Sequence, residues 1–170
     1  MKKHQITSKV FSLSCENDKG VLPRIIAIFN RPGYDVITLS QSRTDIDEII
    51  LVSIEVAIPA AKLDHIVLQL NRIVGVLDVT FTIGNVLQSA IYRIDFKTEM
   101  ALIWNCLVRY QARPLMMHNE QLLIHQIGNE TEIQNLYREL DGPQLIGFSQ
   151  QPLPISQPLS WEEVQQLSRF

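Results

Sequence analysis

Apolar and polar residues alternate from residue 9 to residue 15, which is the period of a half-buried strand. After a polar turn, the apolar residues recur three to four positions apart, and this spacing predicts a helix over residues 21–30. A second strand is predicted over residues 36–42. The stretch Cys15–Leu39 therefore forms a strand end, turn, helix and strand, and we expect the rest of the chain to be organised around it.

The next segment continues this series of elements. A β-branched run predicts a third strand over 48–58, with every second residue on one apolar face. Residues 60–73 show helical spacing, and Gly75 ends that helix. A fourth strand is predicted over 76–83. The order strand, helix, strand, strand, helix, strand is that of a ferredoxin-like fold, an antiparallel sheet with two helices on one face.

The same order repeats with a weaker pattern in the second half of the chain. The predicted elements are a strand over 90–96, a helix capped by Thr98 and ending near 110, strands over 114–118 and 121–127, a helix after Gly128-Asn129, and a strand over 145–149. The fold class is therefore predicted as α+β, with two tandem ferredoxin-like βαββαβ domains at residues 1–84 and 85–150.

The remaining residues, 151–170, have a different character. Three prolines between residues 152 and 158 predict an extended segment. Ser160 followed by Glu163 is a capping-box pattern, which predicts a short terminal helix. Such a helix is too short to be stable alone, so we expect it either to dock on a domain or to fray.

Composition narrows the class of protein. The 170 residues are 46% apolar and 19% charged, a globular balance, and no apolar run reaches the roughly 20 residues of a membrane span. The basic start of the chain has no apolar segment after it, so no signal peptide is expected. A net charge of −3 provides no basic surface for nucleic acid. Cys15 and Cys106 are interpreted as buried free thiols. We expect a cytoplasmic protein that binds neither nucleic acid nor membrane.

The usual enzyme signatures are absent: there is no nucleophile elbow, phosphate-binding loop or dinucleotide-binding fingerprint. His118 and His125 could approach each other across a hairpin, but nothing supplies a third metal ligand. Glu16 and Asp18 precede a helix, where acidic residues more often complement the helix dipole than act as acid and base. We therefore expect no catalytic residue and no metal site.

The turn before the first helix suits a zwitterionic amino acid. The N–H groups of Gly20–Leu22 could donate to its carboxylate, and Asn17 and Asp35 could accept from its ammonium group. Asn17 is about as well suited to a local hydrogen bond within the turn, and glycine precedes many helices, so both interpretations stay open. The side chains that could form an aliphatic wall are Val21, Leu22, Val36 and Ile37.

A family resemblance rests on Glu16-Asn17-Asp18-Lys19-Gly20-Val21-Leu22, followed by Arg24, Phe29 and Gly33-Tyr34-Asp35-Val36. This motif resembles the opening of ACT domains. More specifically, it is similar to that of the small, regulatory subunit of acetolactate (acetohydroxyacid) synthase. The family pattern is E-N-x-x-G-x-L-x-R, then F, then G-Y-N-I, with a second βαββαβ domain after it. The resemblance covers nearly the whole chain, and its specificity lies in residues 16–36.

The resemblance implies a regulatory subunit that does no catalysis itself. It implies a homodimer that activates the thiamine-diphosphate-dependent catalytic subunit of acetolactate synthase in branched-chain amino-acid biosynthesis. It also implies feedback inhibition by valine or another branched-chain amino acid. The thiamine diphosphate, magnesium and FAD would belong to the catalytic subunit, and this chain would hold no cofactor. The effector would lie between two ACT domains, held by Asn17, Gly20, Val21 and Leu22 of one chain and by Asp35 and Val36 of the other.

The chain departs from the family pattern at Asp35, where the family has asparagine. An aspartate still accepts from an ammonium group, but it loses a donor and adds a negative charge. In the second domain, Trp104, Met116 and Met117 match no family motif and are interpreted as core residues.

Two other functions are kept as alternatives. One is a stand-alone ACT-type amino-acid sensor that regulates another enzyme or regulator. The other is a small ferredoxin-like enzyme, which the absence of a catalytic constellation disfavours.

Overall fold

Two four-stranded antiparallel sheets are present in the computed structural model, which describes residues 7–83, 86–95, 100–153 and 159–167. The chain divides into two compact units. The first comprises residues 1–84 together with 154–170, and the second comprises residues 85–153. Of the tail predicted at residues 151–170, the first three residues belong to the second unit, where β8 ends at Pro152, and the rest groups with the first unit.

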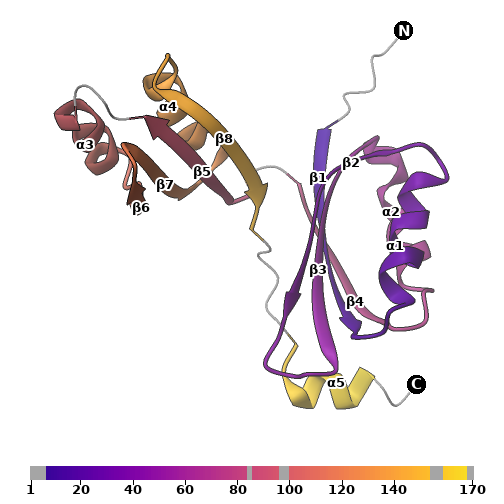
Figure 1. Cartoon of the computed structure of the whole chain (residues 1–170). Helices are drawn as coiled ribbons and strands as arrows, with labels where there is room; N and C mark the ends of the chain where they lie inside the picture. Colours follow the sequence, from indigo (N-terminus) through magenta and orange to yellow (C-terminus); the bar gives the residue numbers. More distant parts are fainter. Residues whose placement is uncertain (1–6, 84–85, 96–99, 154–158, 168–170) are drawn as a thin grey trace, which may run out of the picture. The chain divides into compact units, whose positions relative to one another are not determined.

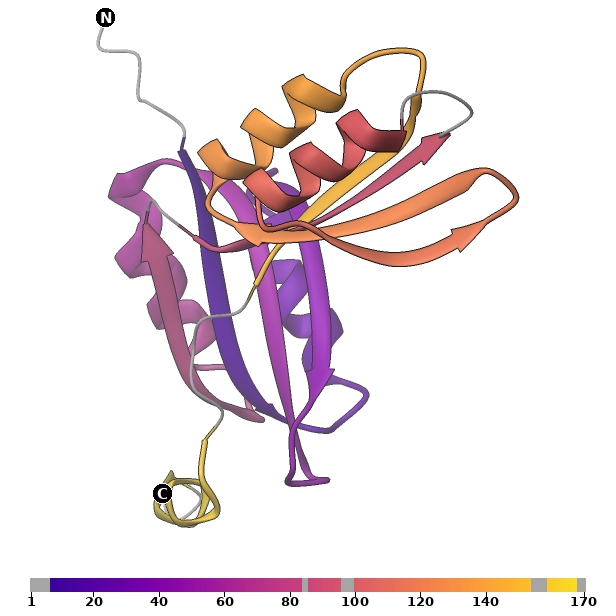
Figure 2. The same ribbon diagram turned by 90° about the vertical axis from the view of Figure 1, so that its left-hand side faces the viewer.

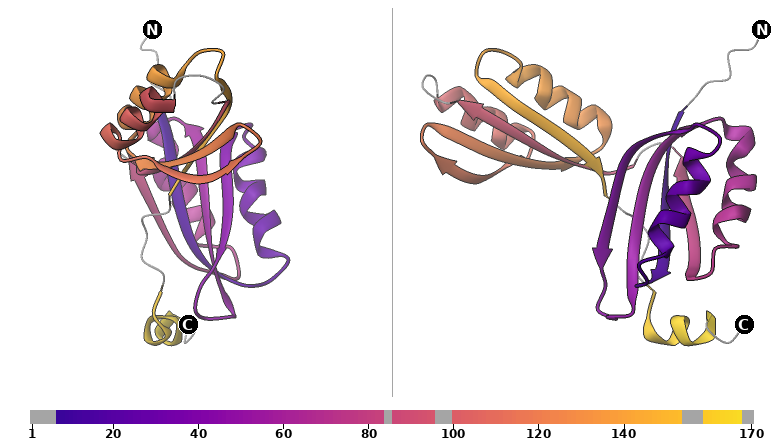
Figure 3. Two further views of the ribbon diagram at one scale, coloured as in Figure 1. Left: turned by 60° about the vertical axis from the view of Figure 1, so that its left-hand side comes forward. Right: turned by 45° about the vertical axis from the view of Figure 1, so that its right-hand side comes forward.

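The first sheet has the strand order β2-β3-β1-β4 (Figure 1). Its helices pack on one face (Figure 3), and the apolar sides of β1 and β3 meet them there. Along β1, Leu13 pairs with Val52 on one side and with Val79 on the other, so the alternation of both strands stays in register. The elements are β1 (Thr7–Glu16), α1 (Val21–Asn30), β2 (Asp35–Arg43), β3 (Ile49–Ile58), a 3₁₀ turn (Ala60–Lys62), α2 (Leu63–Leu70) and β4 (Val76–Ile83).

The second sheet repeats this order as β6-β7-β5-β8, with its two helices side by side on one face (Figure 2). Its core includes the fully buried ring of Tyr92, whose hydroxyl donates to Gln126 Oε1 (2.8 Å) and to the Ile133 carbonyl (3.0 Å). The predicted α+β fold with tandem ferredoxin-like units is confirmed. The elements are β5 (Gln88–Asp95), α3 (Met100–Arg109), β6 (Arg113–His118), β7 (Gln121–Gly128), α4 (Glu130–Leu140) and β8 (Leu145–Pro152).

The two sheets share a β-bulge at the same place. In β2 the register shifts between Val36 and Thr38, and in β6 it shifts between Pro114 and Met116. In each case one aliphatic residue falls outside the pairing, and its side chain is more than half exposed. A bulge bends an edge strand and re-aims a side chain. The two residues are Ile37 (54% exposed) and Leu115 (56% exposed).

Helix α5 (Trp161–Leu167) belongs to the first unit. The predicted capping box is present: the Ser160 N–H donates to Glu163 Oε2 at 2.8 Å, and the Glu163 N–H donates to Ser160 Oγ at 3.4 Å. The hydrogen bonds that the Ser160 backbone N–H and hydroxyl donate to the Glu163 carboxyl lower its pKa. Val164 and Leu159 form a small apolar cluster with Ile46, Ile49 and Leu77.

The prediction that Trp104, Met116 and Met117 lie in the core is wrong. Their side chains are 40%, 62% and 58% exposed. Strand β6 is an edge strand with every side chain exposed, so the short apolar run there does not mark burial. In helix α3 the polar residues Asn105 and Arg109 lie opposite the buried Ile103 and Leu107, and Trp104 lies on the side between these two faces, so an apolar residue there is not buried. Leu102 on the same helix is 57% exposed.

The cysteines and histidines take ordinary positions. Cys15 is buried and Cys106 is half-buried, and both are free thiols. His118 pairs with Gln121 next to the β6–β7 turn, whereas His125 pairs with Arg113 at the other end of that hairpin, so the two histidines are not neighbours. The described residues contain no group of three or more His, Cys, Asp or Glu side chains that could hold a metal ion. No helix among them is long and apolar enough to span a membrane.

Candidate functional site

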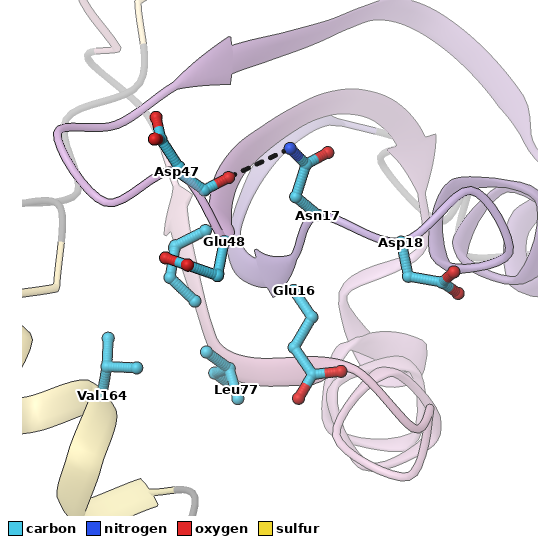
Figure 4. A pocket seen from close by; sticks show the side chains of 8 residues that line it. Glu16, Asn17, Asp18, Asp47, Glu48, Leu77 and Val164 are labelled. Carbon is cyan, nitrogen blue, oxygen red and sulfur yellow. Dashed lines mark hydrogen bonds between the residues drawn. The ribbon is translucent and has the colours of Figure 1, made fainter.

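The turn between β1 and α1 is tied to the loop between β2 and β3. The Asn17 backbone N–H donates to the Glu48 carbonyl at 2.7 Å, and its side-chain amide donates to the Asp47 carbonyl at 3.1 Å (Figure 4). The amide nitrogen is therefore engaged within the fold, as the turn-forming interpretation of Asn17 predicts, and its side-chain oxygen is the group left to meet a ligand.

Asp18 occupies the start of α1. Its Oδ2 accepts the Gly20 N–H at 3.1 Å, and its backbone carbonyl accepts the Val21 N–H at 3.1 Å. A carboxylate there is stabilised by the unpaired N–H groups and by the partial positive charge of the helix end. Two of the three N–H groups expected to hold an effector carboxylate therefore already have an internal partner.

The remaining donor is the Leu22 N–H, which donates to no oxygen among the described residues. The side chains of Val21 and Leu22 differ in burial. Val21 is fully buried in the core of the first unit, so its side chain packs there and cannot line an open pocket. Leu22 is partly buried and packs at the edge of that core. Of this pair, Leu22 is the residue that a ligand could contact.

Arg24 organises the turn, a role that the sequence interpretation did not assign. Its Nε donates to the Gly20 carbonyl at 2.8 Å, its Nη1 to the Val74 carbonyl at 3.2 Å, and its Nη2 to Asp18 Oδ2 at 3.3 Å. One guanidinium thus joins the turn, its acidic residue and the connection before β4. The only signal in the sequence was the spacing of four residues between Gly20 and Arg24, which places both on one side of the first helical turn.

Two glycines make room for this arrangement. A Cβ on Gly20 would lie 2.9 Å from Arg24 Nη2 and 3.0 Å from Asp18 Oδ2, so glycine lets these side chains close over it. Gly75 has φ +93°, and a Cβ there would lie 2.6 Å from Val21 Cγ2. Its carbonyl accepts the Glu16 N–H at 2.7 Å, which fixes the end of β1 against the start of β4.

Asp35 and Val36 lie at the other end of α1. They start β2, directly after the turn that follows the helix, where Asp35 is exposed and Val36 is half-buried. A helix of ten residues is about 15 Å long, so within one chain they are well separated from Gly20. The predicted site residues therefore form two groups, and a ligand of amino-acid size could touch both groups only if each came from a different chain.

A cavity of about 670 Å³ opens beside Asn17 (Figure 4). The carboxylates around it diverge, so they do not form a metal cage, and its remaining wall is apolar. Every lining residue belongs to the first unit. They come from the end of β1, the β2–β3 loop, β4 and α5: Glu16, Asn17, Asp18, Asp47, Glu48, Ile49, Leu77 and Val164.

The other cluster with shifted pKa values lies between α3 and α4 in the second unit. The Glu139 carboxylate accepts from Tyr110 (2.6 Å), from Arg109 (2.9 Å) and from the Cys106 thiol (3.3 Å). The hydrogen bond from Tyr110 is the main cause that lowers the pKa of Glu139. Burial, and then Glu139, raise the pKa of Cys106, so this thiol is not activated as a nucleophile. The cluster joins two helices and shows no catalytic arrangement.

Comparison with known sequences places this turn in a known family. The family model described as "ACT domain" matches residues 17–79, which begin at Asn17 and end in β4. Over longer spans, the chain is 24% identical to the acetolactate synthase small subunit of Mycolicibacterium smegmatis and 26% identical to that of Mycobacterium avium. Each match covers 76% of this chain, and 79% and 80% of the respective relative. Identity rises to 31% with the acetolactate synthase isozyme 3 small subunit of Escherichia coli, over 42% of this chain and 44% of that one.

A solved structure has the same fold over both units. The acetolactate synthase small subunit of Thermotoga maritima matches with a TM-score of 0.74 and 16% identity, over 86% of this chain and 94% of that one. At this identity the likeness concerns the fold. Taken together, the matches show that residues 17–79 resemble an ACT domain and that the chain is similar to acetolactate synthase small subunits over about three quarters of its length.

Proposed function

We propose that this chain is the regulatory subunit of an acetolactate synthase in branched-chain amino-acid biosynthesis. It activates a thiamine-diphosphate-dependent catalytic subunit and binds a branched-chain amino acid between the ACT domains of two copies. The observation that carries the proposal is the extent of the sequence matches. The mycobacterial small subunits align with 76% of this chain, which is more than the ACT domain alone, and all are named for the same enzyme.

The division of the site into two groups supports binding between copies. The Leu22 N–H and the Asn17 side-chain oxygen lie at one end of α1, and Asp35 lies at the other. Two chains placed antiparallel would bring the first group of one copy to the second group of its partner. The ligand carboxylate would take the Leu22 N–H, and its ammonium group would lie near Asn17 and near Asp35 of the partner copy.

The edge of the first sheet supports a dimer. Strand β2 pairs with β3 on one side, and no described strand pairs with its other side. It contains no proline and no lysine, the residues that commonly protect such an edge. Ile37 and Leu39 on this strand are 54% and 39% exposed, so pairing of two β2 edges would also cover apolar surface.

The charges at the site favour the ammonium end of the ligand. Asp18 already holds the helix start, and Asp35 adds a second carboxylate where the family pattern has an amide. These carboxylates attract an ammonium group and repel a carboxylate. Unlike the asparagine of the family pattern, Asp35 has no N–H to donate to the ligand carboxylate, and its charge repels that carboxylate, so we expect the effector to bind more weakly here than at a site that keeps the asparagine.

The test is the acetolactate synthase activity of the cognate catalytic subunit, measured with and without this chain and then with valine, leucine or isoleucine added. We expect several-fold activation, and inhibition by at least one of the three amino acids. An Asp35→Asn variant, which restores the family residue, should be inhibited at lower amino-acid concentration and should activate to the same extent.

The outcomes separate the parts of the proposal. Activation without inhibition in either form would keep the partner and reject the effector. Amino-acid binding without activation would favour the alternative, a stand-alone sensor acting on another protein. Absence of both would reject the proposed function as a whole.

A further inference from the structure

Helix α5 rests on the first unit through few contacts. Val164 is 9% exposed, and among the side chains that the structure describes on this helix it is the only buried one. Val164 and Leu159 together pack on the apolar cluster of Ile46, Ile49 and Leu77. We refer to residues 159–167 as the C-terminal clasp.

The clasp is folded only while it is docked. Helix α5 has seven residues, whereas isolated helices become stable only beyond about 12–15 residues. Its capping box between Ser160 and Glu163 lowers the cost of starting the helix but does not replace docking. Among the described side chains of the clasp, Val164 is buried and Leu159 is partly buried, and a contact of this size can open and close reversibly.

The residues under the clasp also hold the effector turn. Val164 lines the same cavity as Asn17 and Glu48. Ile46 and Ile49 flank the two residues whose carbonyls accept the Asn17 backbone and side-chain N–H groups. Thr44 Oγ1 closes this loop further by bonding to the Ile46 and Ile49 carbonyls at 3.0 and 2.9 Å. A displaced clasp would therefore uncover the loop that positions Asn17.

We propose that the C-terminal clasp is a reversible lid on the β2–β3 loop. While docked it holds the loop and, through Asn17, the effector turn in their folded geometry. When the clasp is released, the β2–β3 loop and the effector turn become less rigid. The effect on amino-acid binding rests on the proposed function, whereas the effect on the loop does not.

Charge makes this docking dependent on salt. Helix α5 carries Glu162 and Glu163, and it docks beside a cavity lined by Glu16, Asp18, Asp47 and Glu48. Arg24 is the nearby cation paired with one of them, Asp18. The remaining carboxylates repel one another, and this repulsion is screened as ionic strength rises. The clasp should therefore dock more tightly in about 0.3 M salt than at low ionic strength.

Hydrogen–deuterium exchange of the full chain tests the lid directly. Val164→Asp places a charge in the apolar contact, whereas Gln165→Asp places the same charge on the exposed side of the same helix. We expect amides of residues 13–20 and 44–51 to exchange about tenfold faster in Val164→Asp than in the wild-type chain. In Gln165→Asp their exchange rates should equal those of the wild type. Amides of β7 in the second unit should exchange at the same rate in both variants. Equal exchange of the 13–20 and 44–51 segments in the two variants would overturn the proposal.

Calorimetric titration with valine then tests the regulatory consequence. If the wild-type chain binds valine, Val164→Asp should weaken binding at least about fivefold, and Gln165→Asp should not. Equal affinity in the two variants would reject coupling between clasp and effector. If the wild-type chain binds no branched-chain amino acid, the proposed effector site fails, and the exchange experiment still decides whether the lid exists.

Discussion

The two units of this chain share a topology but differ in the side chains that they bury and in the turn before their first helix. Their strand orders correspond position by position, and the bulges of β2 and β6 leave out the equivalent residue. The second unit buries the Tyr92 hydroxyl and the Gln126 amide and joins them by a hydrogen bond, whereas the buried polar side chains of the first unit, apart from Lys9, are serines on β1 and β3. The first unit also builds a polar turn at the start of α1, tied together by Arg24.

This difference shows which layer of the structure carries function. Sheet pairing and helix packing can be repeated with unrelated side chains, because they need only the right alternation and volume. The turn of the first unit depends on individual atoms: a glycine without a Cβ, a carboxylate at a helix start and a guanidinium that bridges them. We therefore expect changes in the turn to alter regulation, and changes in either core to alter stability alone.

The largest expected effect belongs to Gly75→Ala. The new methyl group would clash with Val21, and the positive φ adds backbone strain, so the first unit should lose about 3 kcal/mol. Gly33→Ala is the matched control, since its φ is +77° but nothing lies within 4 Å of the added Cβ. It should cost only about 1–2 kcal/mol. Denaturant unfolding of both variants measures the difference, and equal losses would show that the contact with Val21 is unimportant.

High pH should destabilise the first unit through Cys15. Burial raises the pKa of its thiol from 9.0 to about 12, so the folded chain keeps a proton that the unfolded chain releases. This stability is present below pH 9 and is lost as pH rises toward 12, by up to about 1.4 kcal/mol per pH unit. Cys15→Ala should show a flatter decline in unfolding free energy than the wild type or Cys106→Ala. An unchanged slope would contradict this assignment.

The second unit should respond to loss of its internal hydroxyl. Tyr92→Phe removes the hydrogen bonds to Gln126 and to the Ile133 carbonyl and leaves the amide oxygen partly unsatisfied, which should cost about 1–2 kcal/mol. Tyr137→Phe is the control, because that ring also stacks on Phe148 but its hydroxyl makes no hydrogen bond among the described residues. Domain-resolved hydrogen exchange should show the loss in the second unit and none in the first. A similar cost for both variants would indicate that packing, and not hydrogen bonding, dominates.

The smallest expected effect is on ligand affinity. Asp18→Asn keeps an acceptor for the Gly20 N–H but removes the charge that competes with a ligand carboxylate at the helix start. We expect valine to bind about threefold more tightly. Asp64→Asn, which also changes a carboxylate in the first turn of a helix, should leave affinity unchanged. Weaker binding in Asp18→Asn would mean that the Asp18 charge contacts the ammonium group instead.

The sequence was sufficient for the sheets, since their residues alternate with a period of two and the order of elements repeats. It was also sufficient for the capping box at Ser160, which is a local pattern. It was insufficient for Trp104 and Met116, because an apolar residue on an edge strand, or beside the buried face of a helix, looks like a core residue. The engagement of the Gly20 N–H by Asp18 depends on one side-chain rotamer, which no periodicity encodes.

The position of the clasp in the chain affects the order in which the protein can be built. Strands β1–β4 leave the ribosome before the second unit has been made. The apolar cluster of Ile46, Ile49 and Leu77 is covered only after Leu159 and Val164 have been synthesised. Until then, that surface is available to chaperones and to other nascent chains. The first unit thus begins to emerge before the second unit and is completed only after it.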